Sequence, residues 1–316
     1  MSLGSFASRV VATKVVATDG TGDFTDIQSA INDLPSGGGV VYIKEGTYTI
    51  TAKIEIKQDN TALIGSGRAT QIKTTSGIHI IDDDSHTGLF ISQLLLTGSG
   101  SAKAGQVGIN FATTKDSAIS NCWFKDIGTS GIIFSTSTTN NNVITENHIE
   151  DCIEFGIELS GTENVCSNNI IRNNQDGGIQ LLADGDKSVI TGNIITGNTD
   201  QGIRCLAADV LITNNFISTN VEDGITLQTA DDVIISNNII IDNDSGDTAT
   251  FSGIRTIQTS TNVVITGNSM HGNDKYQIDI EADNSVIVGN RLDDTGAVGN
   301  INDTSTGSVV ASNKET

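Results

Sequence analysis

Acidic and polar side chains recur at fixed places beside a repeated Gly-Ile pair, and these residues are the best suited to chemistry. Two residues before the glycine, four successive repeats carry a carboxylate: Glu154, Asp176, Asp200 and Glu222. Two residues after the glycine or its equivalent, the repeats carry Glu158, Gln180, Arg204, Thr226, Arg255 and Asp279. If equal positions stack, carboxylates lie beside amide and cationic groups on one wall, as acid and base catalysis requires. The alternative is a solvated charged face.

Glycoside hydrolysis is one reaction that such a ladder of carboxylates supports. It needs two carboxyl groups on either side of the bond that is broken. Neighbouring repeats pair Asp200 with Asp176 on one side and with Glu222 on the other. Carboxyl groups in neighbouring repeats predict retention of the anomeric configuration, whereas groups two repeats apart predict inversion, because their separation decides the outcome.

β-Elimination on a uronate sugar is the second reaction that fits. It requires a cation, commonly Ca²⁺, that neutralises the sugar carboxylate, and a base that removes the neighbouring proton. Glu154, Asp176 and Glu158 are the candidates for holding calcium. The candidates for the base or charge clamp are Arg204 and Lys275, which stands at the ladder position of a later repeat.

A second calcium candidate lies in an insertion over residues 239–252. The carboxylates of Asp242, Asp244 and Asp247 stand close together in it. Hard cations favour such clusters of oxygen ligands. The spacing differs from that of an EF-hand loop, so an ordinary polar loop is the alternative.

Side chains that would bind a sugar are few. The polar candidates are Gln180 and Arg255, and the aromatic candidates for stacking on a ring are Phe155, Tyr276 and Trp123. The four histidines lack a partner at metal-ligand spacing and are interpreted as surface or corner residues: His79, His86, His148 and His271.

The elements that position these residues follow a repeat of about 23 residues. Asparagine marks it at Asn121, Asn147, Asn169, Asn193, Asn215, Asn238, Asn268, Asn290 and Asn313. A second series follows five residues later, at Asn174, Asn198, Asn220, Asn243 and Asn273. Each repeat holds three short β-prone runs separated by turn residues, such as SVIT, NIIT and GIRCL in residues 187–209. This pattern predicts an all-β, single-stranded right-handed parallel β-helix, in which equal positions stack about 4.8 Å apart.

The β-helix is expected over residues 62–316 as one continuous domain of about 10 to 11 coils. Residues 1–9 are interpreted as a lead-in or cloning remnant, and residues 10–61 as N-terminal strands with a capping helix. Thr25 and Gln28 form a possible capping box for that helix, which would cover the first coil. Its apolar face consists of Phe24, Ile27, Ile31 and Leu34.

Composition excludes some partners. The formal charge is −21, with 38 acidic and 17 basic residues, so nucleic acid is not expected, because its binding depends on neutralising phosphates. No apolar run reaches the roughly 18 residues of a membrane span, and no membrane insertion is expected. The cysteines show neither zinc nor CxxC spacing, and inward repeat positions predict buried free thiols: Cys122, Cys152, Cys166 and Cys205.

Residues 19–50, DGTGDFTDIQSAINDLPSGGGVVYIKEGTYTI, resemble the N-terminal region of the pectate-lyase-like superfamily. In that superfamily a capping helix leads through a glycine-rich turn into the first strands. The units NNIIRNNQDGGIQLL and GNIITGNTDQGIRCL are similar to the repeats of carbohydrate-binding and sugar-hydrolase domains, NosD-type proteins and mannuronan epimerase modules. The resemblance implies the same β-helix fold, but a fold does not determine an activity.

The catalytic motifs of three enzymes in that superfamily have no match here. Where mannuronan epimerases have Tyr-Gly-Phe-Asp-Pro-His-Glu, residues 130–136 read SGIIFST and lack the Tyr, Asp and His. The Gln-Asp-Thr and Asp-Phe-Ile-Phe-Gly segments of pectin methylesterases are absent, and the paired aspartates and His-Gly of polygalacturonases have no clear counterpart. The epimerase chemistry is therefore not expected.

The function expected from the sequence is recognition of a polysaccharide or cell-surface glycan, with cleavage by a lyase or hydrolase reaction. The location that suits it is extracellular, or the surface of a cell or virion. A non-catalytic adhesin or tail-spike-like module is the alternative. The chain stops at Thr316 in mid-coil, which predicts that another subunit or a longer parent protein covers the C-terminal end.

Overall fold

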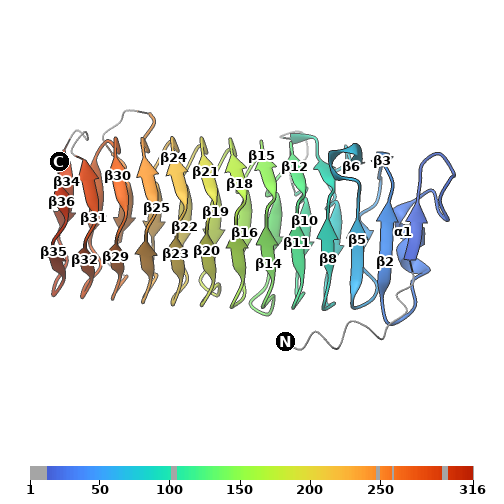
Figure 1. The fold of residues 1–316 in the computed structure, drawn as a ribbon, viewed down its shortest axis with the longest axis horizontal. Helices are drawn as coiled ribbons and strands as arrows, with labels where there is room; N and C mark the ends of the chain where they lie inside the picture. The colour runs from blue at the N-terminus through green and yellow to red at the C-terminus, as the bar shows by residue number, and fades with distance from the viewer. Residues whose placement is uncertain (1–12, 101–104, 247–249, 258–259, 294–297, 316) are drawn as a thin grey trace.

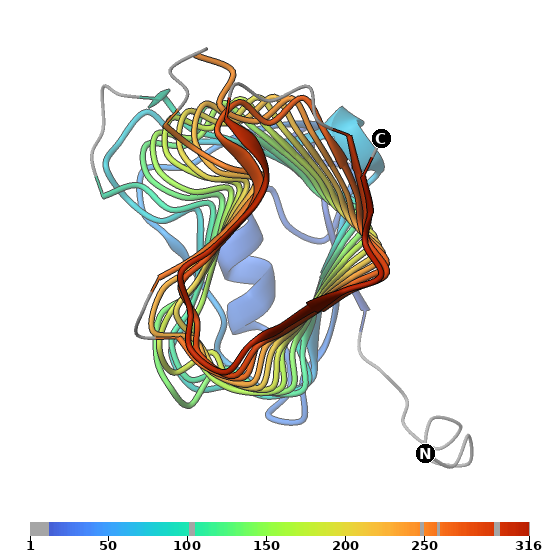
Figure 2. The ribbon, with the colours of Figure 1, turned by 90° about the vertical axis from the view of Figure 1, so that its left-hand side faces the viewer.

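The computed structural model describes residues 13–100, 105–246, 250–257, 260–293 and 298–315. Its chain winds into three long parallel sheets, which confirms the predicted parallel β-helix (Figure 1). Viewed along the axis, successive coils superpose on one closed outline, with a helix behind the far opening (Figure 2).

Most coils contribute one strand to each sheet. Sheet A has 13 strands: β1 (Thr13–Val16), β2 (Gly39–Ile43), β5 (Thr61–Ile64), β8 (Phe90–Ser92), β11 (Ala118–Ser120), β14 (Val143–Thr145), β17 (Val165–Ser167), β20 (Val189–Thr191), β23 (Leu211–Thr213), β26 (Ile234–Ser236), β29 (Val264–Thr266), β32 (Val286–Val288) and β35 (Val309–Ala311). Sheet B has 12: β3 (Gly46–Thr49), β6 (Thr70–Lys73), β9 (Leu95–Thr97), β12 (Trp123–Lys125), β15 (His148–Glu150), β18 (Ile170–Arg172), β21 (Ile194–Thr196), β24 (Phe216–Ser218), β27 (Ile239–Ile241), β30 (Ser269–His271), β33 (Arg291–Asp293) and β36 (Lys314–Glu315). Sheet C has 11: β4 (Ile54–Glu55), β7 (Ile81–Asp83), β10 (Ile109–Phe111), β13 (Ile132–Phe134), β16 (Ile157–Leu159), β19 (Ile179–Leu181), β22 (Ile203–Cys205), β25 (Ile225–Leu227), β28 (Ile254–Thr256), β31 (Tyr276–Ile280) and β34 (Gly299–Asp303).

The solenoid makes about 12 turns rather than the expected 10 to 11. The additional turns come from β1 to β4, which already pair into the same three sheets. The core is a column of stacked apolar side chains, in which the rings of Phe111 and Phe134 lie parallel with centroids 5.6 Å apart. Parallel sheets need both faces covered, and here the other two sheets of each coil cover the inner face.

Asparagine ladders hold two of the corners together. Asn169 donates from Nδ2 to Oδ1 of Asn193 at 3.0 Å and to the carbonyl of Ile144 at 3.0 Å. The same contacts recur along the predicted series from Asn147, which confirms the ladder. Asn121 was assigned to it wrongly, because Cys122 takes the ladder position and donates its N–H to Asn147.

A short helix, α1 (Ile27–Asn32), covers the first coil as predicted. Its N-cap is Asp26 rather than Thr25, since the Asp26 carboxylate accepts the N–H of Ser29 at 2.8 Å. Gln28 makes no capping box; it exchanges two hydrogen bonds with the backbone of Glu55 on β4. A single 3-10 turn follows at Gly67–Ala69. No helix in the described part of the chain is long and apolar enough to cross a membrane.

The four thiols are free and buried, as predicted. Burial raises the pKa of Cys122, Cys166 and Cys205 to about 12 and also raises the pKa of Cys152. Since the thiolate is the reactive form, the native protein is expected not to react with Ellman's reagent at pH 8. The denatured chain should release four equivalents of chromophore. Rapid labelling of any thiol in the native state would contradict this assignment.

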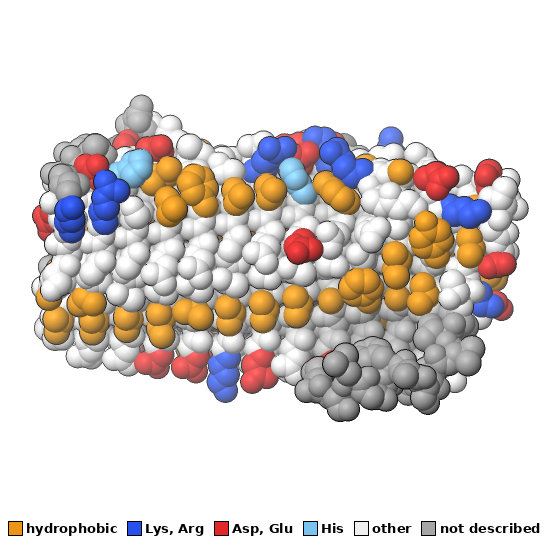
Figure 3. Space-filling view, viewed as in Figure 1, with side chains coloured by type: hydrophobic (Ala, Val, Ile, Leu, Met, Phe, Trp, Pro, Cys, Tyr) orange, Lys and Arg blue, Asp and Glu red, His pale blue; other side chains and the backbone are white. Residues whose placement is uncertain are grey.

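The face formed by sheets A and B carries a charged cluster on sheet B, where Glu150 bonds Lys125, His148 and Arg172. One outward row of sheet A is apolar along nearly the whole solenoid and forms the stripe along the lower strands in Figure 3. The register places in this row Ala62, Phe90, Ala118, Val143, Val165, Val189, Leu211, Ile234, Val264, Val286 and Val309. The predicted chemical groups lie instead on sheet C.

Candidate functional site

The outer side of sheet C carries one row of side chains, one from the middle of each strand. The strand register stacks them in the predicted order: Ile133, Glu158, Gln180, Arg204, Thr226, Arg255 and Asp279. Although they lie on the outer side, Gln180, Thr226 and Asp279 are only 9%, 7% and 2% exposed. Neighbouring side chains and turns therefore cover this wall and lower its contact with water.

A ladder of carboxylates runs beside the row, at the turn that enters sheet C. Backbone hydrogen bonds join its residues from coil to coil: Asp176 to Glu154 at 3.3 Å, Asp200 to Asp176 at 3.1 Å, and Glu222 to Asp200 at 3.4 Å. The predicted stacking of these four residues is confirmed. Because stacked coils are about 4.8 Å apart, like charges on this ladder repel one another unless protons or cations neutralise them.

Asp200 and Glu222 form the most strongly perturbed pair on the ladder. Burial, a hydrogen bond to Asp200 and the Asp200 charge raise the pKa of Glu222 to about 8. A pKa of about 8 leaves Glu222 largely protonated at neutral pH, beside Asp200 in the adjacent coil. The side-chain amide of Gln201 also donates to Glu222. One acid and one base thus stand side by side, the arrangement in which two carboxyl groups take different catalytic roles.

The first half of the ladder shows the same effect more weakly. Burial raises the pKa of Glu154 and Asp176, and in each case the next carboxylate along the ladder raises it further. Glu158, on the neighbouring row, also has a raised pKa because of burial, and the Ser130 hydroxyl that donates to it partly offsets the shift. Perturbed carboxyl groups that cluster in one place indicate a functional site more often than isolated ones do.

Unsatisfied polar atoms gather at this site. Among the described residues, seven buried side-chain polar atoms lack a hydrogen-bond partner, and four of them lie here: Asp200 Oδ1, Gln201 Oε1, Ser252 Oγ and Arg255 Nε. Buried polar groups are nearly always paired in folded proteins, so each exception needs an explanation. A ligand with several hydroxyl groups would supply the missing partners.

Two predicted basic residues are already engaged. Lys275 Nζ lies 2.8 Å from Asp279 and 5.3 Å from the centre of the Tyr276 ring. Arg204 donates from Nη2 to Gln228 at 3.0 Å. Lys275 is thus part of an ion pair at the C-terminal end of the wall, and Arg204 lies three coils before it.

Some predicted binding residues lie elsewhere. Gln180, Arg255 and Tyr276 are on sheet C, as the hypothesis requires. Phe155 is only 7% exposed and packs against Gly177. Trp123 lies on β12 of sheet B, in register with His148. The sequence pattern did not separate these two from the wall, because Phe155 directly precedes a glycine marker and Trp123 follows an asparagine corner.

The predicted metal ligands do not meet at one point. Glu154 and Asp176 are on the ladder, whereas Asp242 follows β27 and lines a different recess with His271. Asp244 turns its carboxylate to the backbone N–H groups of Thr250 and Phe251. Asp247 lies outside the described residues. In the described part of the chain no three His, Cys, Asp or Glu side chains are placed to hold a metal.

One residue of the site was missed at the sequence level. Asp223 is buried, and its carboxylate accepts the N–H of Ser252 at 2.6 Å and the hydroxyl of Thr226 at 2.9 Å. Burial raises its pKa to about 6, while Arg255 and these hydrogen bonds partly offset the shift. It stands directly before the Gly224 marker, where the other repeats carry Val, Ser, Phe, Gly or Gln, so the repeat pattern did not indicate a carboxylate there.

The raised carboxyl pKa values predict how stability depends on pH. The folded state holds the protons of Glu222 and Asp223 more tightly than the unfolded chain, whose values are 4.5 and 3.8. Their contribution is thus present below the unfolded values and is lost as pH rises through about 6 and about 8. The melting temperature should fall between pH 5 and pH 9, and Glu222→Gln should flatten the fall. An unchanged melting temperature over this range would contradict the assignment.

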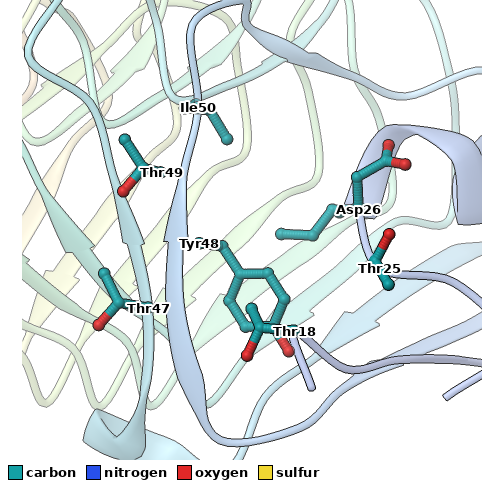
Figure 4. A pocket seen from close by; sticks show the side chains of 8 residues that line it. Thr18, Thr25, Asp26, Thr47, Tyr48, Thr49 and Ile50 are labelled. Atoms are coloured by element: carbon teal, nitrogen blue, oxygen red, sulfur yellow. The ribbon is translucent and has the colours of Figure 1, made fainter. Parts of the chain in front are cut away.

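A different recess, of about 250 Å³, lies beside the start of α1, lined by Thr18, Asp26, Thr47 and Tyr48 among others (Figure 4). Its one carboxylate, Asp26, is used as the helix cap. It therefore offers no pair of acid and base comparable to the ladder.

The solved structures that resemble this chain share its fold at low sequence identity. The A-module of a mannuronan C-5 epimerase from Azotobacter vinelandii is 19% identical with a TM-score of 0.73, and the match covers 92% of this chain and 94% of that one. The enzymatically active domain of tailspike protein 2 of bacteriophage CBA120 is 15% identical with a TM-score of 0.71, covering 93% and 52%. The catalytic domain of an α-1,3-glucanase is 14% identical with a TM-score of 0.70, covering 95% and 65%.

Curated relatives match only short segments. A pectinesterase/pectinesterase inhibitor of Arabidopsis thaliana is 38% identical over 77 residues, which cover 23% of this chain and 14% of that protein. A probable pectinesterase of the same plant is 42% identical over 57 residues, 17% of this chain and 20% of that protein.

Two protein families match a much larger share of this chain. Residues 181–314 match the right handed beta helix region. Residues 36–223, more than half of the chain, match the family described as periplasmic copper-binding protein (NosD). The chain therefore belongs to the NosD family of β-helix proteins.

Proposed function

We propose that this protein binds a polysaccharide along the outer wall of sheet C and hydrolyses its glycosidic bonds. The observation that carries the proposal is the Asp200–Glu222 pair, two carboxyl groups stacked in adjacent coils, where burial and the Asp200 charge raise the pKa of Glu222 to about 8. The unpaired polar atoms of Ser252 and Arg255 on the same wall support a hydroxyl-rich ligand.

The pair supplies both steps of a retaining mechanism. Glu222 donates its proton to the leaving glycosidic oxygen while the Asp200 carboxylate attacks the anomeric carbon, so the bond to the leaving sugar breaks as a glycosyl-enzyme bond forms. Glu222, now a carboxylate, takes a proton from water, whose oxygen displaces Asp200. Retention is expected because carboxyl groups in adjacent coils belong to the short-separation class of about 5 Å.

Similar proteins support a carbohydrate ligand. The structural neighbours include an epimerase of mannuronan and an α-1,3-glucanase bound to tetrasaccharides. Their location also supports our proposal that this protein acts in the periplasm, outside the cell or at a surface, since another structural neighbour is a periplasmic alginate epimerase.

The proposal is tested with a panel of neutral and acidic polysaccharides, incubated with the full chain with and without Ca²⁺. New reducing ends without absorbance near 235 nm support hydrolysis. Absorbance at 235 nm would instead indicate β-elimination, with Arg204 as base or clamp and calcium held through Glu154 and Asp176. Binding to a glycan array without any product would favour the adhesin alternative, and silence in every assay would overturn the proposal.

A copper centre is not supported by the residues of this chain. The thiols of all four cysteines are buried and free. His79 accepts a backbone N–H, while His86 and His148 each bond a carboxylate. No three metal-ligating side chains converge within the described ranges. The mechanism therefore uses no copper.

A further inference from the structure

An aspartate lies inside the solenoid at the N-terminal end of sheet C. Asp83 pairs in register with Phe111 on β10, and the next coil carries Phe134 at this inward position. The Asp83 side chain is 0% exposed. A carboxylate cut off from water is strongly unfavourable unless it is paired and hydrogen-bonded, so its partners explain why it is there.

The partners of Asp83 fix a histidine. Oδ1 lies 2.5 Å from Nδ1 of His86, and Oδ2 accepts the His86 N–H at 3.1 Å and the hydroxyl of Thr114. Because an ionised carboxylate only accepts hydrogen bonds, a neutral His86 ring bonded to it has its proton on Nδ1 and its lone pair on Nε2. His86 lies partly exposed in the turn between β7 and β8, in keeping with its interpretation as a surface or corner residue, and a buried carboxylate sets its orientation.

His86 opens onto a recess. Its side chain is 24% exposed, and the recess, of about 240 Å³, is also lined by Glu55, Lys57, Asp82, Asp84 and Ser85. This volume is below the usual range of about 300–1,000 Å³ for drug-sized ligands, so the recess suits a small group. Asp82 precedes Glu158 by three coils in the row, through Asn110 and Ile133, or roughly 14 Å. The recess is thus separate from the Asp200–Glu222 pair.

We propose that His86 is the general base of a second hydrolytic site, which cleaves small acyl esters. Nε2 takes a proton from water, and the water oxygen bonds to the ester carbonyl carbon. The carbon–oxygen bond to the alcohol then breaks, and the alcohol oxygen takes the proton from the imidazolium, so the products are a carboxylic acid and an alcohol. Asp83 is a positioning residue, as the aspartate of a Ser-His-Asp triad is. The Lys57 ammonium group, which lines the same recess, is held in an ion pair with Glu55.

The test is hydrolysis of p-nitrophenyl acetate by the full chain. His86→Ala is expected to lower kcat/KM by about a hundredfold, the usual contribution of a general base. His148→Ala and His271→Ala are the matched controls, because neither histidine contacts a buried aspartate, and they should keep the rate. Parent activity equal to that of buffer, or a His86→Ala variant as active as the parent, would overturn the proposal. Glu163→Gln, at an exposed turn residue that belongs to neither site, should leave ester cleavage unchanged.

Nuclear magnetic resonance of ¹⁵N-labelled histidine reports which ring nitrogen carries the proton. This measurement tests directly whether Asp83 sets the tautomer of His86. The parent is expected to show one histidine of four locked with the proton on Nδ1, and His86→Ala should remove that signal. Asp83→Asn should shift the tautomer and lower ester cleavage together. A parent spectrum with all four histidines on the Nε2–H tautomer would overturn the assignment, whether or not the Asp83 variant folds.

Discussion

Glu222→Gln is expected to lower kcat for polysaccharide hydrolysis by about 10² to 10⁴-fold, the range for loss of a general acid. The amide is close to the carboxylic acid in shape, so the fold should be kept. It has no proton to give to a leaving glycosidic oxygen. The measurement is reducing-end release on the most active polysaccharide of the panel, at saturating substrate.

The pH profile of the parent separates a catalytic acid from a structural one. With a Glu222 pKa of about 8, activity should fall roughly tenfold per pH unit above that value. Leaving groups that need no protonation, such as p-nitrophenolate, should be released by Glu222→Gln at a rate much nearer to that of the parent.

Glu163→Gln is the matched control for charge and shape. Glu163 is exposed at a turn before β17, away from sheet C's outer row. Its substitution should leave kcat and the melting temperature unchanged. If Glu222→Gln loses no more activity than Glu163→Gln, Glu222 is not the acid. Asp200→Asn should lose activity to a similar degree as Glu222→Gln, and the double variant little more, because residues that act as a unit are not additive.

The order of the carboxylates on the ladder was predictable from the sequence. In a solenoid, residues one repeat apart in the chain lie next to each other in adjacent coils. Once the repeat places Asp176, Asp200 and Glu222 at equal phase, stacking follows from parallel pairing alone. Which members interact most strongly was not predictable. That depends on how deeply each side chain is covered, and the insertion before β28, whose length breaks the repeat, supplies Ser252 and Phe251 there.

The Asp83–His86 pair was not predicted from the sequence, for a different reason. Asp82, Asp83 and Asp84 look like a run of surface carboxylates, although strand alternation from Ile81 already places Asp83 inward. The same strand alternation gives the signal that would have found it: an acidic residue in phase with Phe111 must be buried and therefore paired.

The sequence shows that a glycine recurs in each repeat, but only the structure explains why no larger residue stands there. Its backbone is not in the left-handed region, so conformational freedom does not explain it. A Cβ on Gly202 would lie 2.6 Å from the carbonyl oxygen of Gly224, 2.6 Å from Ile217 Cγ2 and 2.9 Å from Asn220 Nδ2. The glycine lets successive coils approach closely at the entrance to sheet C.

Gly202→Ala should therefore lower the free energy of unfolding by about 3 kcal/mol, at the upper end of the range for overpacking. Two of the three contacts are with backbone or with the asparagine ladder, which cannot move without breaking hydrogen bonds in the adjoining coils. Differential scanning calorimetry measures the effect as a lower melting temperature. Because each coil is stabilised by its neighbours, the loss should spread to the coils on both sides and appear as faster amide exchange there.

Gly37→Ala is the control for glycine itself, because a Cβ there would meet nothing within 4 Å. It removes the same backbone freedom from the unfolded chain, so it should be neutral or stabilise by up to about 1 kcal/mol. A Gly202→Ala variant as stable as Gly37→Ala would show that the coils can separate slightly at no cost. In that case the row of carboxylates on sheet C would also be less tightly spaced, and the strong coupling of Asp200 to Glu222 would weaken with it.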